Sequence, residues 1–316
     1  MPTALITGVS GQDGSYLAEF LVARDYRVIG TTRNAARAVQ GPFGAALRGV
    51  ELLELESPEM WLAKLVEHAK ADEVYHLGGP SRVSDSWTDP EGTRLATVLQ
   101  TSVLVEQIVQ ELPSPRLFFA GSCEVFAPEE RPQDESSPRA PASPYGQAKL
   151  EAMDNVRKAR EQFGIYAVTG ILFNHESPRR GDGFVTRKIA RAAARIAQGK
   201  EKTLTLGNLE VRRDWGFAGD YVRAMWLMMF QDEPADLVIG TGEAHSVATF
   251  CEIAFRHVGL SWRDHVVSDP ALFRQADAPL RLANPARAKA QLGWTPEVDF
   301  ERLVTMMVDY ELGVVT

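Results

Sequence analysis

Residues 4–21 read ALITGVSGQDGSYLAEFL, and this stretch decides the fold. The apolar run at 4–8 predicts a buried strand, and residues 13–26 have the apolar spacing of a helix. Glycines between them permit a tight turn and let backbone N–H groups approach a pyrophosphate at the positive end of that helix. The pattern predicts a dinucleotide-binding turn formed by Gly8, Gly11 and Gly14, with Gln12 and Asp13 inside it.

Apolar runs rich in β-forming residues alternate with stretches of helical period through the first half of the chain. This alternation predicts an α/β fold, a Rossmann-type doubly wound parallel sheet with helices on both faces. Further strands are expected at 27–31, 50–55, 73–77, 116–121, 166–173 and 237–240, and further helices at 58–70, 90–111 and 145–162.

The alternation weakens past residue 174, where Arg, Gly and Pro become frequent. We expect residues 1–173 to form the dinucleotide-binding domain, with later returns of the chain near 212–242 and 284–290. Residues 174–316 are expected to form mainly a smaller C-terminal substrate-binding lobe. The Pro- and Ser-rich segment 127–144 is predicted to be a loop over the edge of the active site.

Composition excludes several classes of protein. A net charge of -8 argues against a nucleic-acid binder. No apolar run approaches the roughly 20 residues that span a bilayer, and no basic stretch precedes an apolar core at the N-terminus. Cys123 and Cys251 make no disulfide framework. We therefore expect a cytoplasmic protein that binds neither membrane nor nucleic acid.

The charge is unevenly spread along the chain. Residues 179–223 contain eleven Lys or Arg and only five Asp or Glu. A basic stretch of this kind indicates a pocket for an anionic small molecule, and the alternative is a solvated basic face. For Arg179 and Arg180 the pocket and a solvated loop are equally good interpretations.

The end of the second expected strand bears on the choice of cofactor. NAD-selective sites place a carboxylate there, whereas this chain has Thr31-Thr32-Arg33-Asn34. An arginine pairs with a 2′-phosphate, so we expect NADP. The alternative is that Arg33 is a solvated loop residue. Leu77, at the end of the fourth expected strand, is predicted to line the same cofactor site.

Tyr145 and Lys149 form Y-x-x-x-K at the start of an expected helix, which places both side chains on one face. A nearby ammonium is expected to lower the pKa of the phenol, so that it exchanges a proton with an alcohol or ketone. Ser122 ends the preceding strand and is expected to hydrogen-bond the same oxygen. The order of these motifs is that of the short-chain dehydrogenases, which this chain resembles: first the glycines, then Ser122, then Tyr145 and Lys149. Tyr145 and Lys149 are also expected to contact the cofactor.

Glu124 lies two residues beyond Ser122. A second acid/base group beside a hydride-transfer site indicates chemistry beyond simple oxidation, such as removal of a proton next to a newly formed ketone. The alternative, an exposed glutamate at the rim, is equally good from the sequence alone. The six histidines show no metal-ligand spacing, so no metal site is predicted.

Several longer stretches resemble the GDP-mannose 4,6-dehydratase family. They are the opening stretch quoted above, GILFNHESPRRG (170–181), FVTRKI (184–189), LGNLEVRRDWGFAGDYVRAMWLM (206–228) and LGWTP (292–296). The resemblance implies that hydride passes from C4 of the hexose to NADP and returns to C6. It also implies that Tyr145, supported by Lys149 and Ser122, takes the C4 hydroxyl proton, and that Glu124 removes the C5 proton as water leaves C6. The implied product is GDP-4-keto-6-deoxymannose.

The resemblance also implies a pocket for the nucleotide. Asn174 matches a diphosphate-binding asparagine, Lys188 a residue near the guanine, and Arg213 and Arg274 contacts to the phosphates or ribose. Asp277 stands where the family has a ribose-binding glutamate. The alternative activity is that of a related enzyme, such as a GDP-4-keto-6-deoxymannose reductase or a GDP-heptose dehydratase.

The resemblance further implies a homodimer or homotetramer. In the short-chain class the helices near 90–111 and 145–162 pair with their copies, and both are expected to carry long apolar faces. The paired arginines that the family has after its second strand, in a loop that helps to build its tetramer, are here Arg33-Asn34. This departure leaves dimer and tetramer both open.

Overall fold

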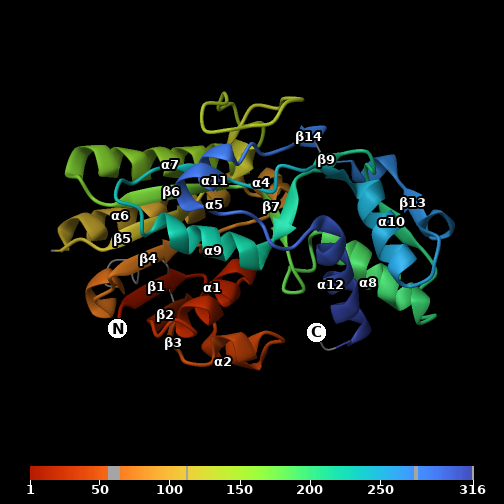
Figure 1. Cartoon of the computed structure of the whole chain (residues 1–316), viewed down its shortest axis with the longest axis horizontal. Helices are drawn as coiled ribbons and strands as arrows, with labels where there is room; N and C mark the ends of the chain where they lie inside the picture. The colour runs from red at the N-terminus through yellow and green to blue at the C-terminus, as the bar shows by residue number, and fades with distance from the viewer. Residues whose placement is uncertain (56–64, 112, 274–276, 315–316) are drawn as a thin grey trace.

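The computed structural model describes residues 1–55, 65–111, 113–273 and 277–314. Its centre is a seven-stranded sheet in the order β11-β6-β5-β4-β1-β2-β3, with every neighbouring pair parallel (Figure 1). The strands are β1 (Thr3–Thr7), β2 (Arg27–Thr32), β3 (Val50–Glu54), β4 (Glu73–His76), β5 (Arg116–Ala120), β6 (Ala167–Leu172) and β11 (Leu237–Ile239).

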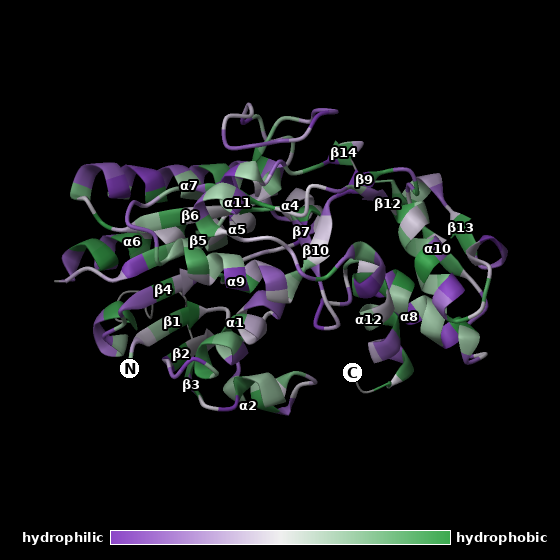
Figure 2. Ribbon diagram, in the orientation of Figure 1, coloured by the Kyte–Doolittle hydropathy of each residue, from purple (hydrophilic) through white to green (hydrophobic). Residues whose placement is uncertain are grey.

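The sheet forms because its inner strands are apolar on both sides, as parallel strands covered by helices must be. Leu5 of β1 belongs to the core on one face, whereas its neighbours Ala4 and Ile6 belong to the core on the other. The chain order reverses between β1 and β4, the position where an open α/β sheet binds its ligands. Figure 2 shows these central strands as largely hydrophobic. The predicted doubly wound sheet is confirmed.

Helices cover both faces of the sheet. Those in contact with the first three strands or with the late returns of the chain are α1 (Gln12–Val22), α2 (Ala35–Gln40), α9 (Ala218–Met228) and α11 (Ala286–Leu292). Those around the fourth to sixth strands are α4 (Val83–Thr88), α5 (Pro90–Arg94), α6 (Gln100–Gln110) and α7 (Pro144–Phe163).

Two expected helices differ from the structure. The one predicted at 90–111 is not a single α-helix, because a π-helical stretch, Leu95–Leu99, separates α5 from α6. Of the one predicted at 58–70, residues 65–69 are helical, and residues 58–64 lie outside the described residues. Helix α1 ends at Val22 because the chain turns at Asp25, whose φ of 59° is incompatible with a right-handed helix.

A second lobe lies beside the sheet and packs around a core of its own (Figure 1). Its helices are α8 (Val185–Ala197), α10 (Val247–His257) and α12 (Phe300–Leu312). The remaining short strands are β7 (Asn174–Glu176), β8 (Leu204–Leu206), β9 (Arg212–Arg213), β10 (Trp215–Phe217), β12 (His245–Ser246), β13 (Val266–Ser268) and β14 (Leu280–Arg281). The chain passes between lobe and sheet several times, since α9, β11 and α11 return to the sheet.

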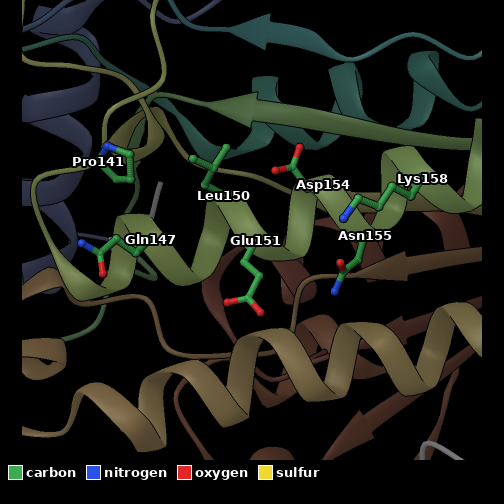
Figure 3. A pocket seen from close by; sticks show the side chains of 7 residues that line it. All are labelled: Pro141, Gln147, Leu150, Glu151, Asp154, Asn155 and Lys158. Atoms are coloured by element: carbon green, nitrogen blue, oxygen red, sulfur yellow. The ribbon is translucent and has the colours of Figure 1, made fainter.

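The outer side of α7 does not carry the apolar face that was expected. Its apolar residues Ala152, Met153 and Val156 are buried in the core of the chain itself, and Glu151 pairs with Arg94 of α5 at 2.7 Å. A pocket of about 270 Å³ on this side is lined mainly by side chains of polar residue types (Figure 3). Its lining residues are Pro141, Gln147, Leu150, Glu151, Asp154, Asn155 and Lys158.

Candidate active site

The glycine turn between β1 and α1 has no room for side chains. Gly8 has a φ of +70°, and a Cβ there would lie 2.8 Å from the Gly78 Cα atom. A Cβ on Gly14 would lie 2.4 Å from the Gly8 carbonyl oxygen. The Gly11 amide closes the turn by donating to that same oxygen at 3.0 Å. The turn is thus a backbone cradle at a helix N-terminus, which fits a dinucleotide pyrophosphate.

Gln12 and Asp13 connect this turn to the second lobe. The Gln12 side chain donates to the His175 carbonyl at 3.1 Å and accepts from Ser177 at 2.9 Å. Asp13 Oδ2 lies 2.8 Å from His175 Nε2. Burial acts to raise the pKa of Asp13, but the charge and hydrogen bond of His175 outweigh it and lower that pKa. Burial likewise acts to lower the pKa of His175, and Asp13 raises it, so the two form an ion pair.

Arg33 is exposed just beyond β2. Its neighbour Asn34 caps α2 by accepting from the Arg37 amide at 2.7 Å. A carboxylate that was not predicted also lies here. Glu54, at the end of β3, accepts a hydrogen bond from the Ala35 amide at 2.8 Å. The end predicted to bind the cofactor therefore carries the exposed Arg33 and an acid, Glu54, that is already engaged by the backbone.

A cleft of about 670 Å³ lies between the sheet and the second lobe. It brings together most of the predicted site residues, whereas Arg33 and the glycine turn lie outside its walls. The predicted residues that line it are Asp13, Leu77, Ser122, Glu124, Tyr145, Lys149, Asn174, Lys188, Arg213 and Asp277. Arg274, predicted to contact the nucleotide, lies outside the described residues.

Ser122, Tyr145 and Lys149 meet where β5 ends and α7 begins. Each is buried, with 7–8% of its surface exposed. Lys149 Nζ donates to the Ala120 carbonyl at 2.9 Å and lies 5.9 Å from the centre of the Tyr145 ring. Helix α7 approaches this closely because residue 146 is glycine; a Cβ there would be 2.4 Å from the Glu124 carbonyl oxygen. The structure therefore brings the three predicted residues together.

The electrostatics of the triad correct one expectation. Burial raises the pKa of Tyr145, and the nearby Ser122 hydroxyl only opposes the rise. Burial lowers the pKa of Lys149 to about 8, against the opposing charge of Asp13. The expected lowering of the phenol pKa by Lys149 is therefore wrong for the protein alone, because desolvation of the phenol outweighs any benefit from the ammonium.

Glu124 lies in the cleft beside the triad, with 22% of its side chain exposed. Its Oε2 atom accepts from Arg281 at 3.2 Å, a contact between residues 157 positions apart. The glutamate is thus neither a rim residue nor an isolated one. Sequence reasoning missed Arg281, because no motif connects β14 to the segment after β5.

Residues of the second lobe form the part of the cleft that is predicted to bind the substrate. Arg213 donates to the Ala278 carbonyl at 2.8 Å and pairs with Asp277 at 2.5 Å. The Asn174 Oδ1 atom is buried and has no hydrogen-bond partner among the described residues. Because a buried polar atom without a partner is costly, its presence in a cleft wall indicates a ligand that supplies the donor or a bridging water.

Only some of the cations in the basic stretch 179–223 line the cleft. Arg180 and Lys188 line it with Arg213, and Arg82 joins them from the loop after β4. Arg179 instead pairs with Glu19 and stacks on the Tyr16 ring, outside the cleft. Neither Arg179 nor Arg180 is a solvated loop residue, since their side chains are 16% and 13% exposed. Other cations of the stretch form ion pairs: Arg187–Glu311, Arg191–Asp182, Arg195–Glu201 and Arg223–Glu297.

Two further observations concern the described residues only. They contain no cluster of three or more His, Cys, Asp or Glu that is able to hold a metal ion. None of their helices has the length and apolar character needed to cross a bilayer.

The strand order, the glycine turn and the Ser122, Tyr145 and Lys149 arrangement are those of the short-chain dehydrogenase/reductase class. Within it, the chain belongs to the family described as GDP-mannose 4,6 dehydratase, whose model matches residues 5–307. The chain is 41% identical to GDP-mannose 4,6 dehydratase 1 of Arabidopsis thaliana over 326 residues, which cover 98% of this chain and 89% of that one.

Solved structures with similar folds agree with this class. A UDP-glucose 4-epimerase of Thermotoga maritima has a TM-score of 0.86 at 23% identity, with 98% of both chains covered. RMD from Pseudomonas aeruginosa, complexed with NADPH, has a TM-score of 0.82 at 22% identity, with 100% of both chains covered. At these identities the likeness concerns the fold.

Proposed function

We propose that this protein is a GDP-mannose 4,6-dehydratase, which converts GDP-mannose to GDP-4-keto-6-deoxymannose. One observation supports this beyond family membership: a single cleft holds the Ser122, Tyr145 and Lys149 triad together with a second acid/base group, Glu124. A simple reductase needs the triad, but its reaction has no step that requires a carboxylate base beside the triad.

NADP is the proposed cofactor, and when bound it accepts a hydride from the sugar and later returns one. The backbone of Gly8, Gly11 and Gly14 would hold its pyrophosphate, because a side chain at Gly8 or Gly14 would fill that cradle. Gln12, Asp13 and Leu77 are proposed to border it, and Arg33 to pair with the 2′-phosphate. Tyr145 and Lys149 are proposed to lie against its reactive end.

Tyr145 is proposed to exchange a proton with the C4 hydroxyl, with Ser122 hydrogen-bonded to the phenol oxygen. The Lys149 ammonium compensates negative charge that develops on that oxygen. With a pKa of about 8 it remains mostly protonated at neutral pH. Burial of all three residues excludes water from this step.

Glu124 is proposed to act once C4 is a ketone. The ketone acidifies the C5 proton, and the carboxylate removes it. The electron pair of the broken C5–H bond forms the C5–C6 double bond, and the C6 hydroxyl leaves with the proton as water. Glu124 is then a carboxylate again, so the elimination consumes nothing.

The second lobe is proposed to bind the nucleotide. Asn174 and Arg213 face the cleft at the proposed diphosphate, Lys188 is assigned to the guanine, and Asp277 to the ribose. Arg274 is assigned to the phosphates or ribose. On this proposal residues 1–173 form the NADP-binding domain, to which the chain returns near residues 212–242 and 284–290. Residues 174–316 form mainly the lobe that binds the nucleotide sugar.

We also propose that the protein is a homodimer or homotetramer. Leu95 and Leu99 support a covered surface here, because they are 46% and 40% exposed. Such an interface would combine apolar contacts from residues 95–99 with polar contacts from the α7 side chains drawn in Figure 3.

The activity is tested by incubating the purified protein with NADP and a panel of GDP- and UDP-sugars, without added reductant, and measuring product masses. We expect GDP-mannose alone to lose one water. Tyr145→Phe is the matched negative control. Product that gains two hydrogens only when NADPH is added would identify a reductase, and water loss from another sugar would identify a different dehydratase.

A further inference from the structure

Arg281 is a buried arginine whose guanidinium reaches the proposed active site. It is 1% exposed, one of the largest fully buried side chains of the chain. One terminal nitrogen donates to the Phe126 and Ala127 carbonyls at 3.1 and 3.3 Å, and the other donates to Glu124 Oε2 at 3.2 Å. A charged group is tolerated at such depth only when it is paired and hydrogen-bonded.

The backbone of Arg281 is fixed in turn. Strand β14 pairs with β9, so that Arg281 is the register partner of Arg213. The Asp214 amide donates to the Arg281 carbonyl, and the Gln133 amide donates to the next carbonyl, both at 2.8 Å. The guanidinium therefore has little freedom to follow Glu124, and the contact constrains the glutamate more than the arginine.

Among the described residues, Arg281 is the side chain that hydrogen-bonds the Glu124 carboxylate. The bond engages Oε2, one of the two carboxylate oxygens, and Glu124 remains part of the cleft wall. A glutamate at a partly exposed wall has several rotamers available. A charge-assisted hydrogen bond from a fixed donor selects one of them.

We propose that Arg281 is a positioning residue for the elimination step: it holds the Glu124 carboxylate where it removes the C5 proton and passes that proton to the departing C6 hydroxyl. Arg281 itself neither gains nor loses a proton. This inference rests on the proposed dehydratase function. It assigns to β14 a role in the chemistry in addition to its place beside the nucleotide-binding strand β9.

The test compares Arg281→Met with Arg160→Met. Arg160 is a matched control, because it forms an ion pair with Asp236 at 2.8 Å, has 17% of its side chain exposed, and is not among the residues that line the cleft. Both variants are given NADP and GDP-mannose. The rate of C4 oxidation is read from the first-turnover absorbance of reduced nicotinamide, and the elimination from C5 exchange with deuterated solvent and from water loss.

We expect Arg281→Met to slow exchange and water loss by about tenfold to a hundredfold, the effect of losing one hydrogen bond to a charged group. The oxidation rate and KM should be unchanged, so reduced nicotinamide accumulates. Arg160→Met should change none of these rates. Equal losses in oxidation and elimination, or wild-type elimination, would overturn the inference. If Arg281→Met does not fold, Arg281→Lys is measured in the same way, with the same step selectivity and a smaller loss expected.

A double variant separates this inference from the proposed function. In Glu124→Gln, which has lost the base, adding Arg281→Met should slow elimination no further. A further loss of tenfold would show that Arg281 acts elsewhere and would refute its positioning role. If Glu124→Gln alone kept wild-type turnover, the dehydratase mechanism would fail whatever Arg281 does.

Discussion

Replacing Asp13 by Asn should destabilise the protein in a pH-dependent way. Asp13 and His175 form a part-buried ion pair at 2.8 Å, with side chains 22% and 12% exposed. The pair joins the glycine turn to β7, where the His175 ring stacks on Tyr221 at 4.5 Å between centres. Arg180 is the other charged group that acts on both members.

The magnitude follows from the burial of the pair. Two unit charges about 4 Å apart attract by about 4 kcal/mol at an effective dielectric constant of 20. Desolvation offsets part of this, and breaking a fully buried pair costs about 3–5 kcal/mol. Because this pair is partly exposed and Asn keeps a neutral hydrogen bond, we expect Asp13→Asn to lower the free energy of unfolding by about 2–3 kcal/mol near pH 5.5.

The sign of the pH dependence is fixed by the two shifts. The pKa of His175 is raised, so its stabilisation is complete below its unfolded pKa and is lost as pH rises through its folded pKa. The pKa of Asp13 is lowered, so its stabilisation is present above its unfolded pKa and is lost as pH falls through its folded pKa. The pair stabilises most between about pH 4 and 6.5.

Urea titrations at about pH 5.5 and pH 8.5 measure the effect. Asp13→Asn should cost less at the higher pH, because the stabilisation that comes from the raised pKa of His175 is lost as pH rises through its folded pKa. Asp236→Asn is the matched control, because it breaks the Arg160–Asp236 ion pair at 2.8 Å, which contains no histidine, and its cost should be the same at both pH values. A cost for Asp13→Asn that is independent of pH would refute the charged pair.

Other predictions concern function. Arg33→Ala should weaken NADP binding more than NAD binding; equal or tighter NAD binding by the unaltered protein would refute the NADP preference. Arg213→Ala and Arg274→Ala should each weaken GDP binding by about tenfold to a hundredfold, and unchanged binding in both would place the pocket elsewhere. Tyr145→Phe should nearly abolish C4 oxidation with cofactor binding intact, whereas Glu124→Gln should leave oxidation and slow water loss by about 10²–10⁴-fold. Light scattering should give at least twice 34.9 kDa, and a mass of one chain at micromolar concentration would exclude a dimer.

The sheet was predictable because buried parallel strands are continuous apolar runs bounded by turn residues. Strands such as β6 were predicted to within a residue at each end for this reason. The break between α5 and α6 was not predictable, because a π-helical turn at Leu95–Leu99 keeps an apolar pattern close to that of a regular helix. The apolar face expected on α7 exists, but its residues pack in the core of the same chain and do not form an outward surface. The apolar pattern alone does not distinguish these two positions.

The proximity of Tyr145 and Lys149 was predictable because the two residues are one turn apart on one helix. Arg281 was not, since its contact with Glu124 depends on the pairing of two strands of two residues each, β9 and β14. Such short strands leave no periodic signal. The pKa of Tyr145 was misjudged because sequence spacing reports a nearby ammonium but not the desolvation that outweighs it.

The two proposed acid/base groups have surroundings that match the steps assigned to them. Tyr145 is 8% exposed, among buried neighbours, which suits a hydride step that must exclude water. Glu124 has 22% of its side chain exposed, which suits a step whose product is water that must leave. A partly exposed carboxylate has several rotamers available, and here the buried guanidinium of Arg281 restrains it by a hydrogen bond. In the proposed mechanism the cleft therefore separates a dry oxidation at Tyr145 from a solvent-accessible elimination at the neighbouring Glu124, through burial of the phenol and a fixed hydrogen-bond donor for the carboxylate.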